Sequence, residues 1–271
     1  VVTHCEDPQR VKDREQIFDD KYGDNLSAEH HHLIRDVDSC YLSSSLAVDL
    51  AKKYDADLHV FHLTTEKEME LFTSGMIDGK KITAEVCVHH MLLNDSYYPE
   101  LGNQIKCNPS IKTETDRQAL IKSLKEDKID IIATDHAPHT WDEKMQDYKD
   151  APAGLPLVQH GLQILMDFYH KDILSLETIV EKTSHNVAKR FQVKDRGYIR
   201  EGYYADLAVL DIDKSYEVTK ENILYKCGWS PFLGKTFPSS IYLTIVNGNI
   251  AFQDGEISKD LPFGMQIKFD R

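Results

Sequence analysis

Short apolar runs that end in ionisable residues are the feature that most constrains the fold of this chain. Ile131 and Ile132 are consecutive and β-branched within the run 129–134, as expected for a parallel strand that is buried on both faces. The run 58–62 is similar and ends in a histidine. A helical pattern precedes each run, and this alternation predicts βα units and a parallel sheet.

The helical segments are predicted from apolar spacing and capping residues. One helix is expected over 40–54, with Leu42, Leu46 and Leu50 on one face, and another begins after the N-cap Thr113. Two more are expected over 155–169 and over 175–191, the second with Ser175 as its cap. The polar segment 140–153 is expected to be a loop, and we consider it a candidate mobile flap.

From about residue 196 the pattern changes to strands. Runs at 203–210 and 242–246 are strand-like, and Asn247-Gly248 indicates a hairpin because both turn positions need positive φ. We therefore predict an α/β part over 1–195 and a small β-rich region over 196–271.

Composition excludes several classes of protein. The 271 residues carry a formal net charge of −13, which argues against a nucleic-acid-binding surface. No apolar run is long enough to span a membrane. The five cysteines include no CxxC pair, which favours a reduced, cytoplasmic protein.

The segment 133–139, Ala-Thr-Asp-His-Ala-Pro-His, lies where the buried strand opens into a loop. Catalytic groups of β/α barrels gather at such strand ends. Asp135 there would bind a metal ion and accept a proton. Alternatively, Asp135 caps the next helix and His136 packs in the core.

Other histidines also lie at or near strands. His4 follows Val1-Val2-Thr3 and His62 ends the run 58–62, and imidazole is a common zinc ligand. A lone histidine at a strand end is more often structural, but three strand ends make coincidence less credible. His30-His31-His32 is expected in a solvated loop. His89-His90 is read as part of a strand, so at most one ring would face a cavity.

Six segments together resemble the dihydroorotases of the amidohydrolase superfamily. They are VVTHCEDP, LHVFHLTTEKEM, EVCVHHMLL, CNPSIK, IIATDHAPH and GYIREGYYADLAVLD. The resemblance covers essentially the whole chain and implies a (β/α)8 TIM barrel of the metal-dependent hydrolase type, with its second half present and a small C-terminal β-rich region.

The resemblance also implies roles for individual residues. His4 and His62 resemble the metal-binding histidines of the fifth and sixth barrel strands. Asp135 resembles the eighth-strand aspartate that binds metal and transfers the proton. Asn108 and His139 resemble substrate-binding residues. Gly154, with Ala153, either offers backbone groups to the substrate or forms a buried turn. The implied cofactor is Zn2+, one or two ions per complete site.

Some features of the family are missing from the sequence. No His-x-His of a first strand precedes His4, and neither the bridging fourth-strand ligand nor the arginine after the first-strand pair is present. A complete barrel needs about 250 residues. We therefore expect a fragment of a longer enzyme, a truncated form or a short homologue without catalysis, and the start without Met favours the first two. Half a barrel would have open sheet edges.

The resemblance implies zinc-dependent, reversible hydrolysis of L-dihydroorotate to N-carbamoyl-L-aspartate in pyrimidine biosynthesis. The alternatives are another cyclic-amide hydrolase, of the dihydropyrimidinase or allantoinase kind, or a non-catalytic homologue that acts as an assembly partner. The expected partner is the small-molecule substrate, with no nucleic acid or membrane. A homodimer is one expected assembly.

Overall fold

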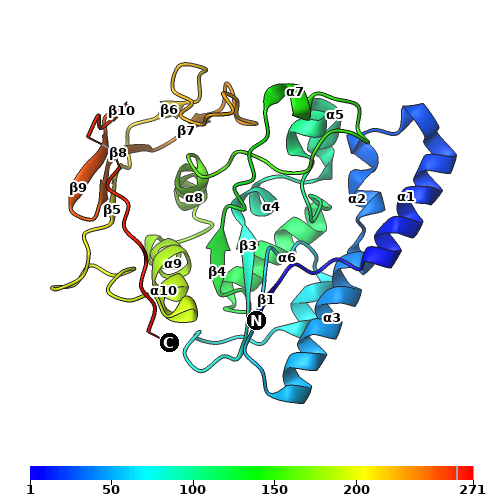
Figure 1. Cartoon of the computed structure of the whole chain (residues 1–271), viewed down its shortest axis with the longest axis horizontal. Coiled ribbons are helices and arrows are strands. Elements are labelled where there is room, and N and C mark those ends of the chain that lie inside the picture. The colour runs from blue at the N-terminus through cyan, green and yellow to red at the C-terminus, as the bar shows by residue number, and fades with distance from the viewer. Residues whose placement is uncertain (261, 271) are drawn as a thin grey trace. The chain divides into compact units, whose positions relative to one another are not determined.

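The computed structural model describes residues 1–260 and 262–270 (Figure 1). The chain forms two compact units. The first contains residues 1–159 and 224–231, and the second contains residues 160–223 together with the chain from 232 onward. The predicted division at residue 195 falls inside the second unit and stays a prediction as a domain boundary.

A four-stranded parallel sheet forms the centre of the first unit, as predicted. Its strands follow the chain in order: β1 (Val2–Thr3), β2 (Leu58–Val60), β3 (Ile82–Cys87) and β4 (Ile131–Ala133). Val60, Ala84 and Val86 are completely buried. Because all four strands are parallel, their carboxyl ends meet at one edge of the sheet, where His4, His62 and Asp135 follow them.

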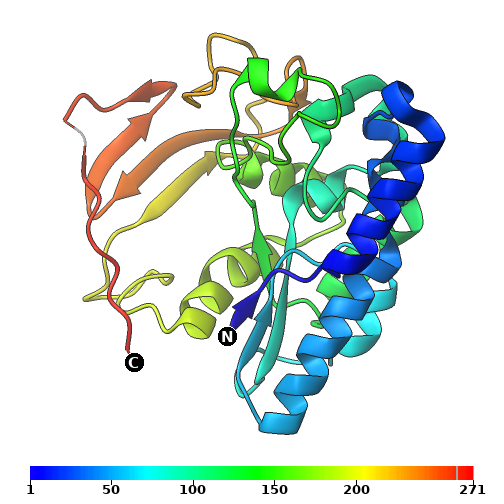
Figure 2. The same cartoon turned by 45° about the vertical axis from the view of Figure 1, so that its right-hand side comes forward.

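Helices of the first unit begin at well-defined caps. Asp7, Asp36 and Thr113 each accept a backbone N–H at the start of a helix, and Thr113 forms a capping box with Asp116. Figures 1 and 2 show α1 and α3 side by side along one side of the sheet. The helices are α1 (Pro8–Tyr22), α2 (His31–Ile34), α3 (Val37–Tyr54), α4 (Val88–Leu92), α5 (Tyr98–Leu101), α6 (Glu114–Lys125) and α7 (Trp141–Lys144). Short 3-10 turns cover Gly23–Asn25, Ala28–His30, Lys67–Leu71, Asp95–Tyr97 and Gly102–Ile105.

Helix α3 confirms the predicted helix but buries a different face. Leu42, Leu46 and Leu50, which were predicted to share one face of the helix, are all exposed. The buried side chains are small ones instead: Ser39, Cys40, Ser44, Val48 and Ala51. The reason is a buried carboxylate, because Ser44 donates a hydrogen bond of 2.5 Å to Glu68 on this face.

Two histidine predictions were wrong. His31 is not in a solvated loop: it begins α2, is buried, and lies 2.8 Å from both the Tyr148 hydroxyl and the Cys107 carbonyl. His89 and His90 are not in a strand, because β3 ends at Cys87 and α4 begins at the next residue. Their rings therefore lie on the same side, with centroids 3.9 Å apart, and both are buried.

The segment 140–153 is more ordered than a polar loop. Thr140 caps α7, and the Lys144 side chain is completely buried. Its ammonium donates hydrogen bonds to the Lys106 and Pro152 carbonyls, at 3.0 and 2.8 Å. That this segment is a mobile flap stays a prediction.

The second unit joins helices to antiparallel strands. Ser175 caps α9 as predicted, whereas the helix expected over 155–169 begins only at Gly161. Asn247 and Gly248 both have positive φ at the predicted hairpin. The helices are α8 (Gly161–His170), α9 (Leu176–Val180), a π-helical turn (Glu181–His185) and α10 (Asn186–Phe191). The strands are β5 (Leu207–Asp211), β8 (Ser240–Val246), β9 (Asn249–Gln253) and β10 (Glu256–Ile257) in one sheet, and β6 (Tyr216–Glu217) with β7 (Thr236–Phe237) in another.

Among the described residues, no helix has both the length and the apolar character needed to cross a membrane.

Candidate metal centre and its surroundings

His4 and His62 meet beyond the ends of neighbouring strands. His4 Nδ1 and His62 Nε2 are 3.0 Å apart, and the rings pack edge to face. Burial and, to a smaller extent, the neighbouring His4 together lower the pKa of His62 to about 4. His62 is therefore a neutral imidazole near pH 7, which is the form that binds a metal ion.

The second nitrogen of His4 is held by a carboxylate. Glu6 Oε2 lies 2.9 Å from His4 Nε2 and 2.5 Å from the Arg35 guanidinium. Burial opposes ionisation of Glu6, but His4 and Arg35 outweigh it and hold the pKa of Glu6 below its usual value. Glu6 thus orients the ring so that Nδ1 faces His62. Glu6 was not predicted from the sequence, although a carboxylate two positions after a candidate ligand is a recognisable orienting partner.

Asp135 follows β4 and interacts electrostatically with His4. Burial raises the pKa of the Asp135 carboxyl, and the Glu85 carboxylate raises it further, while His4 opposes this rise. Asp135 and His62 have φ of 47° and 36°, in the left-handed region that non-glycine residues seldom adopt. Such backbone strain is frequent at functional sites.

The three residues predicted to bind substrate differ in their hydrogen-bond partners. The Asn108 Oδ1 atom is buried and has no hydrogen-bond partner among the described residues. His139 Nε2 lies 3.1 Å from the Ala153 carbonyl. The Gly154 N–H donates to the Lys106 carbonyl at 2.9 Å, so this N–H already has a partner within the chain. No hydrogen bond joins Asn108, His139 or Gly154 to the His4–His62 pair among the described residues, and their substrate roles stay predictions.

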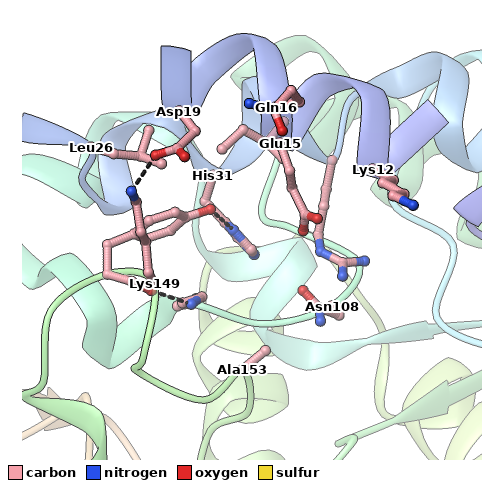
Figure 3. Close-up of a pocket in the computed structure, with 13 residues that line it drawn as sticks. Lys12, Glu15, Gln16, Asp19, Leu26, His31, Asn108, Lys149 and Ala153 are labelled. Atoms are coloured by element: carbon pink, nitrogen blue, oxygen red, sulfur yellow. Dashed lines mark hydrogen bonds and ion pairs between the residues drawn. The ribbon is translucent and has the colours of Figure 1, made fainter. Parts of the chain in front are cut away.

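Asn108 and Ala153 also line a cavity of about 440 Å³ (Figure 3). Its wall carries the cationic side chains Lys12, Arg35, Lys106 and Lys149. Burial lowers the pKa of Lys106 to about 8, and its ammonium donates to the Tyr148 and Ala151 carbonyls. These cations were not predicted from the sequence, because they come from distant segments that only the fold brings together.

The residues present fit a divalent metal ion. Two nitrogens bound to one zinc ion at about 2.0–2.1 Å lie about 3.3 Å apart in tetrahedral geometry, and His4 Nδ1 and His62 Nε2 are already 3.0 Å apart. A carboxylate on the far nitrogen of a ligating histidine is also typical of metal sites. Asp135 would add an oxygen ligand.

Histidine and aspartate side chains beyond the carboxyl ends of parallel strands are typical of metal-dependent hydrolases built on β/α barrels. The chain belongs to the amidohydrolase family, whose sequence model matches residues 1–251.

Curated relatives and solved structures agree with this assignment. The chain is 33% identical to a dihydroorotase of Carboxydothermus hydrogenoformans over 93% of its own length and 58% of the relative's. It is 36% identical to a dihydroorotase of Endomicrobium trichonymphae, over 75% of the chain and 49% of the relative. Its fold is similar to that of an L-hydantoinase (dihydropyrimidinase) from Arthrobacter aurescens, with a TM-score of 0.88 at 23% identity, over 98% of this chain and 60% of that one. The chain thus spans about half to three fifths of these relatives.

Proposed function

We propose that the protein carrying this chain is a metal-dependent cyclic amidohydrolase, and specifically a dihydroorotase that interconverts L-dihydroorotate and N-carbamoyl-L-aspartate. The observation that carries the proposal is the convergence of His4 Nδ1 and His62 Nε2, with Glu6 orienting His4 from behind. The similarity of the sequence to dihydroorotases supports L-dihydroorotate as the cyclic amide that is hydrolysed.

The metal ion is proposed to be zinc, held by His4, His62 and Asp135. When bound, it would supply Lewis acidity toward the ring amide carbonyl. The pKa of Asp135 is raised by burial and by the Glu85 carboxylate, which favours a residue that must both accept and donate a proton during the reaction. In the hydrolytic direction, Asp135 takes a proton from the attacking water and delivers it to the ring nitrogen as the carbon–nitrogen bond breaks.

The substrate would be held by Asn108 and His139. The unpaired Asn108 Oδ1 atom is free to accept a hydrogen bond from a ring N–H. His139 is expected to contact the substrate carboxylate. Holding the ring in a fixed orientation lowers the barrier by removing freedom before the reaction begins.

The first prediction concerns Asp135. In the protein of full natural length, Asp135→Asn should lower kcat for dihydroorotate hydrolysis by about 10²–10⁴-fold, the usual contribution of a general acid–base group. Bound zinc, counted by mass spectrometry, shows whether a loss of metal contributes. Asp142→Asn changes an exposed aspartate of α7 and should leave kcat unchanged. A normal kcat for Asp135→Asn would overturn the assignment.

A substrate panel separates the alternatives. Dihydroorotate, dihydrouracil, hydantoin and allantoin are offered to the same metal-loaded protein. Turnover of dihydroorotate alone supports the proposal. Turnover of an uncharged ring instead would assign a different cyclic-amide hydrolase, and no turnover with metal bound would favour a non-catalytic assembly partner.

A further inference from the structure

A second group of metal-ligand side chains lies at the junction of β3 and α4. Cys87 is the last residue of β3, and His89 and His90 lie in the first turn of α4. Their ligand atoms all lie within 4.8 Å of one another. All three side chains are buried in the first unit. None of them is used by the proposed mechanism.

The imidazole nitrogens of this group lack partners. His89 Nδ1, His89 Nε2 and His90 Nδ1 are buried and form no hydrogen bond among the described residues. Nearly all buried polar atoms in folded proteins have a partner, and each one without a partner costs about 1–3 kcal/mol. Three such atoms in two adjacent rings favour nitrogens that are placed to bind a ligand.

The hydrogen bond of His90 determines which of its nitrogens is free to bind. His90 Nε2 lies 3.0 Å from the Pro109 carbonyl, which only accepts hydrogen bonds, so Nε2 carries the proton. The neutral ring therefore has its lone pair on Nδ1, the nitrogen without a partner. A backbone carbonyl that fixes the tautomer in this way is typical of histidines that bind metal ions.

We propose that Cys87, His89 and His90 bind a zinc-like metal ion, with a ligand set that shares no residue with the His4–His62 pair. One sulfur and two nitrogens form a ligand set that zinc prefers. Ligands at about 2.0–2.3 Å from one ion lie about 3.3–3.7 Å apart, so the side chains need to move by only about 1 Å. Binding converts the Cys87 thiol to a thiolate and releases its proton to solvent.

Cobalt is the probe that separates the two sites. A thiolate bound to Co2+ gives a charge-transfer band in the near ultraviolet, whereas nitrogen and oxygen ligands do not. The proposed set of His4, His62 and Asp135 contains no sulfur. Because the Cys87 group is buried, the chain is refolded in the presence of Co2+ so that the ion enters before the core closes. We expect the band at about one thiolate-bound ion per chain.

Matched variants locate the sulfur. Cys87→Ser should abolish the band and lower the bound cobalt by about one ion per chain. Cys5→Ser removes the buried thiol next to His4 and should retain the band, as should Cys40→Ser, a buried thiol elsewhere in the unit. A band that survives Cys87→Ser, or the absence of any band in the wild-type chain, would overturn the proposal.

Further variants distinguish a loss of metal binding from misfolding, and distinguish this site from the His4–His62 pair. His89→Asn keeps Cys87 and should weaken cobalt binding at the thiolate site by at least about tenfold, a conservative figure for the loss of one ligand. Far-ultraviolet circular dichroism confirms that each variant folds. His62→Asn should leave the band in place even if it removes the other ion, so the two metal proposals succeed or fail independently.

Discussion

Beyond the carboxyl ends of the parallel strands of the first unit, individual residues adopt backbone conformations that β-strands do not have. His62 and Asp135 have positive φ, and each lies two residues beyond the last residue of its strand. A left-handed residue turns the chain sharply out of the strand direction. For non-glycine residues this costs on the order of 1 kcal/mol or more, which the surrounding packing must offset.

Gly154 illustrates a residue whose side chain is excluded by the neighbouring backbone. Its φ is 137°, and an added Cβ would lie 2.5 Å from the Ala137 carbonyl oxygen. We predict that Gly154→Ala lowers the free energy of unfolding by about 3 kcal/mol, from strain and overlap together.

Gly79→Ala is the control for Gly154→Ala, because Gly79 also has positive φ, 84°, but has open space around it. It should cost only about 1 kcal/mol. Urea unfolding of both variants gives the comparison. Equal losses would mean that the close approach to Ala137 contributes nothing.

His31 makes stability depend on pH. Burial lowers its pKa to about 3, against an ordinary value of 6.5 in the unfolded chain. Below pH 6.5 the unfolded chain therefore binds a proton that the folded chain does not bind, so falling pH destabilises the fold until about pH 3. This one group contributes a slope of up to about 1.4 kcal/mol per pH unit.

The variant His31→Asn isolates that slope from those of the other histidines. It loses hydrogen bonds and should be less stable than wild type at pH 7. The difference between the two proteins should then shrink by about 1.4 kcal/mol per unit between pH 6 and pH 4. Urea titrations at each pH measure it, and parallel pH curves would contradict a buried neutral His31.

At the scale of elements, α3 shows what periodicity reveals and what it misses. The helix followed from the sequence, because the leucine spacing predicted it over 40–54. In the structure it covers Val37–Tyr54, with Asp36 as its N-cap and Asp55 in a left-handed conformation at its end. The buried face did not follow from the sequence, because the leucines that share a face lie on the exposed side. The buried Ser44 donates a hydrogen bond to Glu68, and that pairing over 24 residues has no local signal in the sequence.

We predict that truncations on the two faces of α3 differ. Val48 is completely buried and Leu46 is 61% exposed. Val48→Ala should lower the free energy of unfolding by about 2 kcal/mol, for two buried methyl groups and the space that they leave. Leu46→Ala should change it by less than about 0.5 kcal/mol. Thermal or urea unfolding tests both, and a larger loss for Leu46→Ala would restore the leucine face as the core.

In the candidate sites, too, local sequence patterns predicted some features and missed those that depend on contacts between distant residues. Strand-end residues were predictable, because parallel strands bring their carboxyl ends together whatever the details of packing, and His4 and His62 do meet there. The grouping of Cys87, His89 and His90 was not predictable, because His89 and His90 were expected in a strand. In the structure β3 ends at Cys87 and α4 begins at the next residue. Burial of His31 also had no local cue, because its partner Tyr148 is 117 residues away.

At the scale of the whole molecule, β1 and β4 are the outer strands of the parallel sheet among the described residues. The carbonyls of Val1 and Thr3 accept hydrogen bonds from β2, so the N–H and carbonyl of Val2 between them point away from β2. Val2 is 44% exposed. An outer strand of this kind is a template for pairing with another chain.

We therefore predict that the 271-residue chain, purified on its own, self-associates through β1. Val2→Pro removes the outward N–H without removing a β1–β2 hydrogen bond. In a symmetric dimer it deletes two hydrogen bonds of about 0.5–1.5 kcal/mol each, which weakens association by about 5-fold to 100-fold. Val2→Ala keeps the N–H and serves as the control. Sedimentation velocity over a range of concentrations measures both variants. If they associate equally, the contact lies elsewhere on the molecule, because proline at an outward-facing position interferes only with pairing at that edge.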